Sequence, residues 1–178
     1  MAEEIQKFVD VEFTLNEDCV FDLTIDENGD FTKLNSFWTA ILLSLFCERR
    51  ASPTEIQQSF RRRGWIGNIN APVEYGSKLW LLENRRLILE TVNDARTYTE
   101  QCLQRFVDFG YLDVVTVTTS GNIEDILENF VENRCTGALV KRDLETGALL
   151  IDIVLSIGGD TEIRRNIQLW QNTRAMAP

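Results

Sequence analysis

The feature that most constrains the fold is a pair of apolar stretches in the C-terminal part of the sequence. "GALVKRD" (137–143) and "ALLIDIVLSI" (148–157) flank "LETG", a short segment that suits a hairpin turn. In the second stretch every other residue is a large aliphatic one, so one face of that strand must be covered by a core. These residues are Leu149, Ile151, Ile153, Leu155 and Ile157. A chain with such a hairpin has to build a sheet and pack other elements over it.

The rest of the pattern switches between the strand period and the helix period. Strands are predicted at 8–15, 20–26, 112–119 and 162–171, with Asn28-Gly29 favouring a type I′ turn; helices are predicted at 36–47, 79–109 with an interruption near 84–87, and 122–134. The helix at 36–47 is apolar on both faces, which predicts a buried position, and Gly110 is expected to end the second helix. This order of elements predicts a compact single α+β domain. Its mixed or antiparallel sheet packs against two or three helices and ends in an edge strand.

The negative charge is concentrated at the N-terminus. Residues 1–30 contain ten acidic residues and one lysine, which accounts for nearly all of the net charge of −10. We therefore expect an acidic N-terminal β arm or hairpin at 1–34 and one structural unit at 35–178. A negative arm on a nearly neutral body argues against non-specific binding to nucleic acids or anionic membranes.

The residue types present narrow the chemistry. The chain has no histidine, which removes imidazole metal ligands and every Ser-His or Cys-His nucleophile. Its four cysteines have no metal-ligand or redox spacing, so buried reduced thiols, no metal and no cofactor are expected. The N-terminus lacks a basic signal segment and the longest apolar run (37–47) is too short for a membrane span, which predicts a soluble protein made in the cytoplasm. Paired carboxylates for glycoside hydrolysis remain an alternative, although no motif selects any pair.

An arginine cluster, "RRRGWIGN" (61–68), lies in a polar segment (51–76) that we expect to form a long ordered loop. Nucleic-acid binding is one interpretation, with phosphate contacts and base stacking on Trp65. A protein contact is another, because arginine and tryptophan are enriched at binding hot spots. The third is an internal brace in which an arginine pairs with Glu83 or Glu90 and Trp65 fills the core.

The C-terminal strand is the second candidate for a contact. "RRNIQLWQNTR" (164–174) is half polar and comes at the end of the chain, so we expect it at a sheet edge, where strand addition is possible. Ile163, Ile167 and Leu169 are predicted to face inward, and Trp170 to lie on the polar face with Gln168 and its polar neighbours. The alternative is that Trp170 folds onto its own domain.

Two motifs in order carry a resemblance to a known family. "RRGWIGN" followed by "GSKLWLL" (76–82), and then a helix "ETVNDARTYTEQCL", resembles the small baseplate wedge proteins of Mu-like contractile phages. That family is related in turn to the sheath-initiator wedge proteins of T-even phages, some of which carry a lysozyme-like name. The resemblance is good over 36–118 and loose over the C-terminal strands. Asn68 stands where the family has aspartate and Lys78 where it has arginine, so an ion pair of the family between these positions is expected to be weaker or absent here.

The resemblance implies a structural, non-enzymatic role in the tail baseplate of a virion assembled in the host cytoplasm. Proteins of this kind sit around the tube in several copies and contact wedge and hub proteins. They begin the sheath by exchanging β-strands with sheath subunits. The expected partner-binding residues are Arg62, Arg63, Gly64, Trp65, Gly67, Asn68, Gly76, Ser77, Lys78, Trp80, Ile167, Leu169 and Trp170.

Overall fold

A computed structural model describes residues 10–11, 13–15, 21–23, 25–30, 33–34, 38–70, 74–128, 130, 134–157 and 160–171. The chain divides into two compact units, Met1–Leu43 and Ser44–Pro178. The helix α1 (Trp38–Phe46) runs across this boundary. None of the helices in the described residues is long and apolar enough to cross a membrane.

The first unit contains four short strands that form two antiparallel pairs. β1 (Asp10–Val11) pairs with β4 (Lys33–Leu34), and β2 (Phe13–Leu15) pairs with β3 (Phe21–Leu23). The strands expected at 8–15 and 20–26 are therefore present where the structure describes them.

The type I′ turn expected at Asn28-Gly29 is wrong. The amide of Gly29 donates to the Asp26 carbonyl at 3.0 Å, so the turn is centred on Glu27 and Asn28, and Gly29 follows with φ 81°. A type I′ turn needs a positive φ at Asn28, and among the described residues other than glycine only Arg63 has one. The reason is the Asp26 carboxylate, which accepts the amides of Asn28 and Asp30 at 2.8 and 3.0 Å. These bonds hold the pKa of Asp26 below its usual value.

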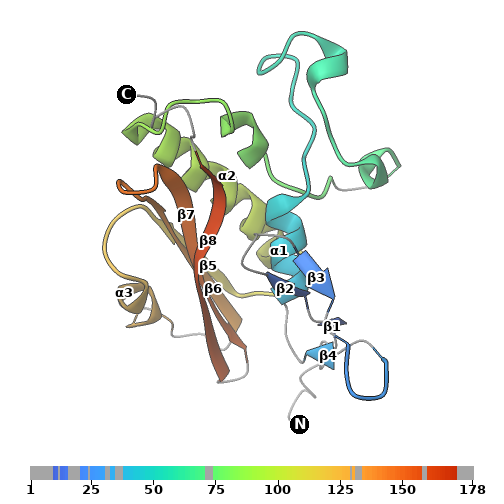
Figure 1. The fold of residues 1–178 in the computed structure, drawn as a ribbon, viewed down its shortest axis with the longest axis vertical. Helices are drawn as coiled ribbons and strands as arrows, with labels where there is room; N and C mark the ends of the chain where they lie inside the picture. The colour runs from blue at the N-terminus through green and yellow to red at the C-terminus, as the bar shows by residue number, and fades with distance from the viewer. Residues whose placement is uncertain are drawn as a thin grey trace. The chain divides into compact units, whose positions relative to one another are not determined.

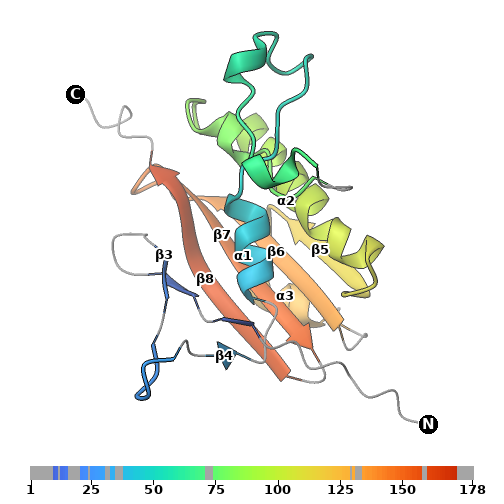
Figure 2. The same cartoon turned by 90° about the vertical axis from the view of Figure 1, so that its right-hand side faces the viewer.

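The second unit is a four-stranded mixed sheet with helices on both faces (Figures 1 and 2). The strand order is β5-β6-β7-β8, in which β5 (Val114–Thr118) is parallel to β6 (Arg134–Arg142), and β7 (Ala148–Ile157) and β8 (Asp160–Gln171) follow antiparallel. The long helix α2 (Leu89–Asp108) covers one face beside β5 and β6, and the short helix α3 (Ile123–Glu128) covers the other. This arrangement confirms the predicted α+β class, and the hairpin β6–β7 confirms the feature from which that prediction started.

The core follows the predicted periodicity. The side chains of Leu149, Ile151 and Ile153 are fully buried on one face of β7. The apolar stripe of α2 is buried at Val92, Ala95, Cys102, Leu103 and Phe106. On the opposite face of the sheet, α3 packs through Ile123 and Ile126 onto Leu139 and Val154.

Helix boundaries agree with the sequence except at α3. A 3-10 turn, η3 (Leu79–Leu82), precedes α2, so the interruption near 84–87 is confirmed. Gly110 ends α2 with φ 75°, and its amide donates to Val107. The helix predicted over 122–134 is too long, because α3 ends at Glu128 and Arg134 already begins β6.

Exposure of α1 and of the thiols differs from expectation at single residues. The side chains of Trp38 and Ile41 are buried as predicted, whereas Leu43 is 51% exposed, so α1 is not buried all round. Cys102 and Cys135 are buried; Cys47 is only half buried, and Cys19 lies outside the described residues. Burial raises the pKa of Cys102 to about 11, and its thiol lies 2.9 Å from the Ser44 carbonyl.

Candidate functional site: the arginine–tryptophan loop and the edge strand

The arginine–tryptophan loop, residues 51–76, contains two 3-10 turns and no α-helix in its described part. These turns are η1 (Ser59–Arg61) and η2 (Ile66–Asn68). The loop is closed at its base, where the Arg49 amide donates to the Ser77 carbonyl and the Ser77 amide donates to the Cys47 carbonyl, both at 2.8 Å. These bonds join the two ends of the loop.

Gly76 and Ser77 build that base. A Cβ atom at Gly76 would lie 2.4 Å from the Cys47 carbonyl oxygen, and Gly76 has φ 100°, so only glycine fits without strain. The buried Ser77 hydroxyl donates to the Leu45 carbonyl at 2.5 Å and accepts the Leu79 amide at 3.2 Å. Both predicted partner-binding residues therefore have an internal role.

Arg62 braces the loop through carbonyl oxygens. Its Nε donates to Ile56 at 3.0 Å and its Nη2 to Gln57 at 3.2 Å, and its own carbonyl accepts the Ala51 amide. A guanidinium has several donors in a fixed plane, so one side chain can hold two successive carbonyls.

Arg63 is the centre of an ion-pair group that joins three segments. Its Nη1 lies 2.8 Å from a Glu48 carboxylate oxygen and 3.2 Å from one of Glu83, and its guanidinium lies 5.0 Å from the ring centroid of Trp80. The hydrogen bond to Glu48 is the main reason that the pKa of Arg63 is raised. These side chains are about 40% exposed, so each pair contributes on the order of 1 kcal/mol or less.

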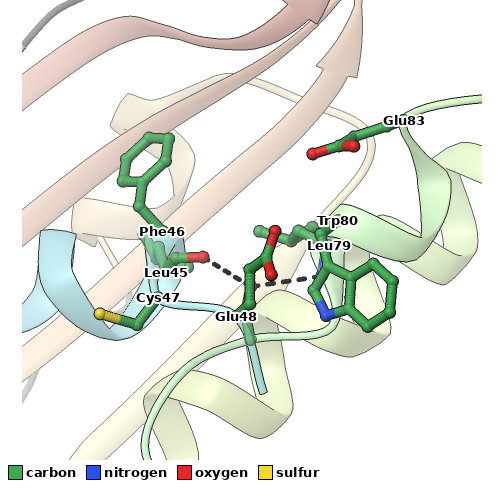
Figure 3. Close-up of a pocket in the computed structure, with 8 residues that line it drawn as sticks. Leu45, Phe46, Cys47, Glu48, Leu79, Trp80 and Glu83 are labelled. Carbon is green, nitrogen blue, oxygen red and sulfur yellow. Dashed lines mark hydrogen bonds between the residues drawn. The ribbon is translucent and has the colours of Figure 1, made fainter. Parts of the chain in front are cut away.

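The predicted pairing of an arginine with Glu83 is therefore confirmed for Arg63, and Glu48 is a partner that the sequence did not indicate. Glu48, Trp80 and Glu83 line a pocket of ≈ 80 Å³ between the end of α1 and η3 (Figure 3). The Trp80 indole donates to the Arg49 carbonyl at 2.9 Å, which fixes its ring under Arg63.

Gly64, Trp65 and Gly67 form the next turn of the loop. Gly64 has φ 123°, and the Trp65 amide donates to the Glu48 carbonyl at 2.8 Å. A Cβ at Gly67 would lie 2.4–2.6 Å from ring atoms of Trp65, so the indole lies directly on the glycine backbone. Trp65 is still 47% exposed, which contradicts the interpretation that it fills the core.

Asn68 and Lys78 have separate partners. The Asn68 amide side chain donates to the Tyr75 carbonyl at 2.7 Å and accepts the Tyr75 amide at 2.8 Å, a pairing that an ionised aspartate cannot make with the carbonyl. Lys78 instead binds Glu55 at 2.8 Å. Burial raises the pKa of Glu55, but the hydrogen bonds from Lys78 and Ser52 outweigh it, so this pKa lies below its usual value.

The terminal strand β8 is at the edge of the sheet, and β7 is its one neighbour among the described strands. Two register shifts interrupt the β7–β8 ladder, one between Leu149 and Leu150 and one between Ile151 and Ile153. Ile163 and Ile167 both pack inward as predicted, but on different faces of the sheet, because Ile163 lies opposite Val154 and Ile167 opposite Ile151.

In the ladder, Trp170 is paired with Leu149 and Gln168 with Leu150. The predicted place of Trp170 on a polar face lies outside what the structure describes. Leu169 falls at the shift between them. Ile167 is 5% exposed and therefore belongs to the core; the side chains of Leu169 and Trp170 are outside the described part.

Comparison with known proteins identifies the family of this fold. The family model of phage protein GP46 matches residues 37–138, more than half of the chain. The chain belongs to the phage protein GP46 family. The matched range includes α1, the arginine–tryptophan loop, α2, β5 and α3, and it ends within β6.

Two curated relatives agree with this assignment. The chain is 35% identical over 85 residues to "Baseplate protein gp46" of Escherichia phage Mu, which covers 47% of the chain and 59% of the relative. It is 36% identical over 87 residues to "Mu-like prophage FluMu protein gp46" of Haemophilus influenzae, which covers 48% of the chain and 58% of the relative. The chain thus spans less than two thirds of either relative. These names confirm the predicted resemblance to Mu-like baseplate proteins and agree with a location in the tail baseplate of a virion.

In this GP46 family member, sequence reasoning missed three exposed apolar residues. Phe60, Ile66 and Ile69 are 81%, 77% and 74% exposed, in a segment that we had interpreted as polar. The sequence did contain a signal for these residues, because large apolar residues occur there in a loop that follows neither the helix period nor the strand period. Within the described ranges, no group of three or more Cys, Asp or Glu side chains is placed to hold a metal ion.

Proposed function

We propose that this protein is a non-enzymatic structural component of a contractile phage tail baseplate. It docks onto neighbouring wedge and hub proteins around the tube, is present in several copies in a ring, and starts sheath assembly by strand exchange with sheath subunits. The name of the Mu relative supports the baseplate part of this proposal.

The strand-exchange part of the proposal depends on a difference between the two edge strands of the sheet, β5 and β8. At one edge, Arg96 of α2 donates to the Val117 carbonyl of β5 at 2.9 Å, so a side chain is already bound to that backbone. At the other edge, the twelve-residue β8 has no second strand beside it among the described residues. Unpaired edge groups favour the addition of another strand.

The ladder favours the first half of β8 as the pairing segment. Its register with β7 is continuous from Asp160 to Arg164 and is interrupted twice beyond that point. Because bulges twist an edge away from a regular ladder, an added strand is best accommodated along 160–164.

The test is a proline substitution at each of two adjacent positions, Thr161→Pro and Glu162→Pro. In an edge strand the backbone N–H groups alternate between the neighbour and the open side, so one of the two prolines removes a bond to β7 and the other removes only an outward donor. Urea unfolding identifies the variant that keeps wild-type stability. Deleting residues beyond Ile163 is not equivalent, because it uncovers the buried side chains of Leu149 and Ile151.

We expect the stable proline variant to enter baseplates but to leave tails without sheath in electron micrographs. The alanine variant at the same position keeps its backbone N–H group and the fold of the protein, so it should form normal sheaths. Normal sheaths with the stable proline variant would rule out strand addition at this edge.

A further inference from the structure

The arginine–tryptophan loop holds apolar side chains out to solvent from a braced backbone. Ile66 and Ile69, in and beside η2, are 77% and 74% exposed, and Trp65 is 47% exposed. The backbone below them is fixed by the Trp65 amide on Glu48 and by the paired bonds between Asn68 and Tyr75. The exposure is therefore imposed by the fold of the loop.

The same residues line a groove. Trp65, Ile66 and Ile69 form its apolar part, and Arg50 and Glu74 lie at its polar part, with a volume of ≈ 310 Å³. Glu74 is paired with Arg49 at 3.1 Å. The groove is large enough for one or two aliphatic or aromatic side chains of another chain.

Arg50, which lines this groove, and Arg61 of η1 have no carboxylate partner within the described part of the chain. Arg50 makes a single hydrogen bond there, from Nη2 to the Ser59 carbonyl at 3.3 Å. The guanidinium of Arg61 lies 5.7 Å from the ring centroid of Phe60, and the Phe60 side chain is itself 81% exposed. By contrast, Arg49 and Arg63 are both in ion pairs. Guanidinium groups left free beside apolar residues favour a partner that supplies carboxylates.

A second copy of this chain is a poor occupant. In a two-fold symmetric contact the patch meets its own copy, and the one carboxylate in the groove lining, Glu74, is already paired with Arg49, so Arg50 would find no unpaired carboxylate in the groove of the other copy. Like charges brought together at an interface oppose binding. The charge pattern instead fits a different protein.

We propose that this groove binds an apolar segment of a neighbouring baseplate protein that carries Asp or Glu beside its apolar residues. Ile66, Ile69 and Trp65 bury the apolar side chains, and Arg50 pairs with a carboxylate. This inference rests on the proposed baseplate function and names the chemistry of the partner for the docking loop.

The first experiment places a benzoylphenylalanine photo-crosslinker at Ile66 or Ile69 in tails assembled in vivo. Leu144, a 75% exposed residue in the β6–β7 turn, is the matched control position. We expect both loop positions to crosslink to one peptide of another baseplate protein, with acidic residues next to its apolar ones. Crosslinks to a second copy of this chain, to a peptide without acids, or at no higher yield than Leu144 would each overturn the inference.

The second experiment reverses charge. Arg50→Glu is expected to lower incorporation into baseplates on the order of tenfold, and reversal of the crosslinked acid in the partner should restore it. Arg86→Glu, at an exposed position before α2, is the control for a general charge effect. Unchanged incorporation of Arg50→Glu, or loss without rescue, would contradict the proposed pairing.

The two proposals fail in different ways. If wild-type protein is absent from purified baseplates, the proposed function itself is wrong. If wild-type protein is present and Ile66→Ser with Ile69→Ser is incorporated normally, the function stands and only the groove assignment fails.

Discussion

The arginines of the loop show how one residue type takes different roles at three consecutive positions. Arg62 bonds to carbonyls of its own loop, Arg63 bridges Glu48 and Glu83, and Arg61 lies against Phe60. Sequence spacing cannot separate these roles, since each depends on which backbone atoms the loop brings within reach. Most of the motif residues thus stabilise the loop from within, which leaves the apolar side chains of η2 to face outward.

At the residue scale, we predict that Gly76→Ala destabilises the protein far more than Gly147→Ala. Both glycines have positive φ, 100° and 66°, so each alanine carries a backbone cost of about 1–2 kcal/mol. At Gly76 the new Cβ also lies 2.4 Å from the Cys47 carbonyl, whereas Gly147 has open space. Forcing the contact apart should add roughly 1–3 kcal/mol.

Urea unfolding of the two variants measures the difference. Equal loss of unfolding free energy would mean that the backbone conformation alone requires glycine at position 76. A larger loss for Gly76→Ala would show that the close approach of the loop base to residue 47 matters as well.

At the element scale, the two faces of the sheet are covered to different extents. The twenty-residue α2 lies on one face, and the six-residue α3 lies on the other. Contact of α3 with the sheet depends on Gly137 of β6, where an added Cβ would lie 2.4 Å from Cγ2 of Ile126. A side chain at this position would push the short helix off the sheet.

We therefore predict that Gly137→Ala costs roughly 1–3 kcal/mol of unfolding free energy. Ile126→Leu removes the branch at Cβ while keeping the volume, so it should recover part of that loss in the double variant. A double-mutant cycle by urea unfolding measures the coupling. If the losses of unfolding free energy in the two single variants simply add in the double variant, the clash between the new Cβ at position 137 and Ile126 is relieved in another way, by movement of β6 or of Val154.

At the scale of the whole molecule, the structure supports a protein that works through its surface. The carboxylates of Glu48 and Glu83 lie near each other, but both bind Nη1 of Arg63, which keeps them from acting as an unpaired acid and base. The exposed features are instead a strand edge and an apolar loop, which are the features of a contact protein.

We predict that the purified chain releases no sugar from peptidoglycan, in contrast to the lysozyme-like name of some relatives of the resembled family. The measurement is turbidity loss of cell walls, with an active lysozyme as the positive control. Turnover by the wild type that disappears in Glu48→Gln or Glu83→Gln would establish catalysis and contradict the non-enzymatic role.

Much of the fold could be predicted because it depends on local periodicity. The alternating aliphatics of 149–157, the stripe of α2 and the stop at Gly110 each reflect neighbours a few residues apart. The length of α3 and the side on which Ile163 and Ile167 lie could not be predicted, because a strand start at Arg134 and two bulges decided them. Bulges leave little trace in a sequence, since they arise from pairing with another strand.

For this protein, the sequence by itself determined the α+β class, the buried hairpin, the helix periods and the motifs that carry the resemblance to Mu-like baseplate proteins. All of these are carried by residue types and their spacing along the chain. The tertiary structure alone decided which arginines are braces, that Gly76 lets the loop approach residue 47, and that Ile66 and Ile69 face solvent. The physical reason is that partners such as Glu48 and Glu83, or Asn68 and Tyr75, meet only after the chain has folded back on itself.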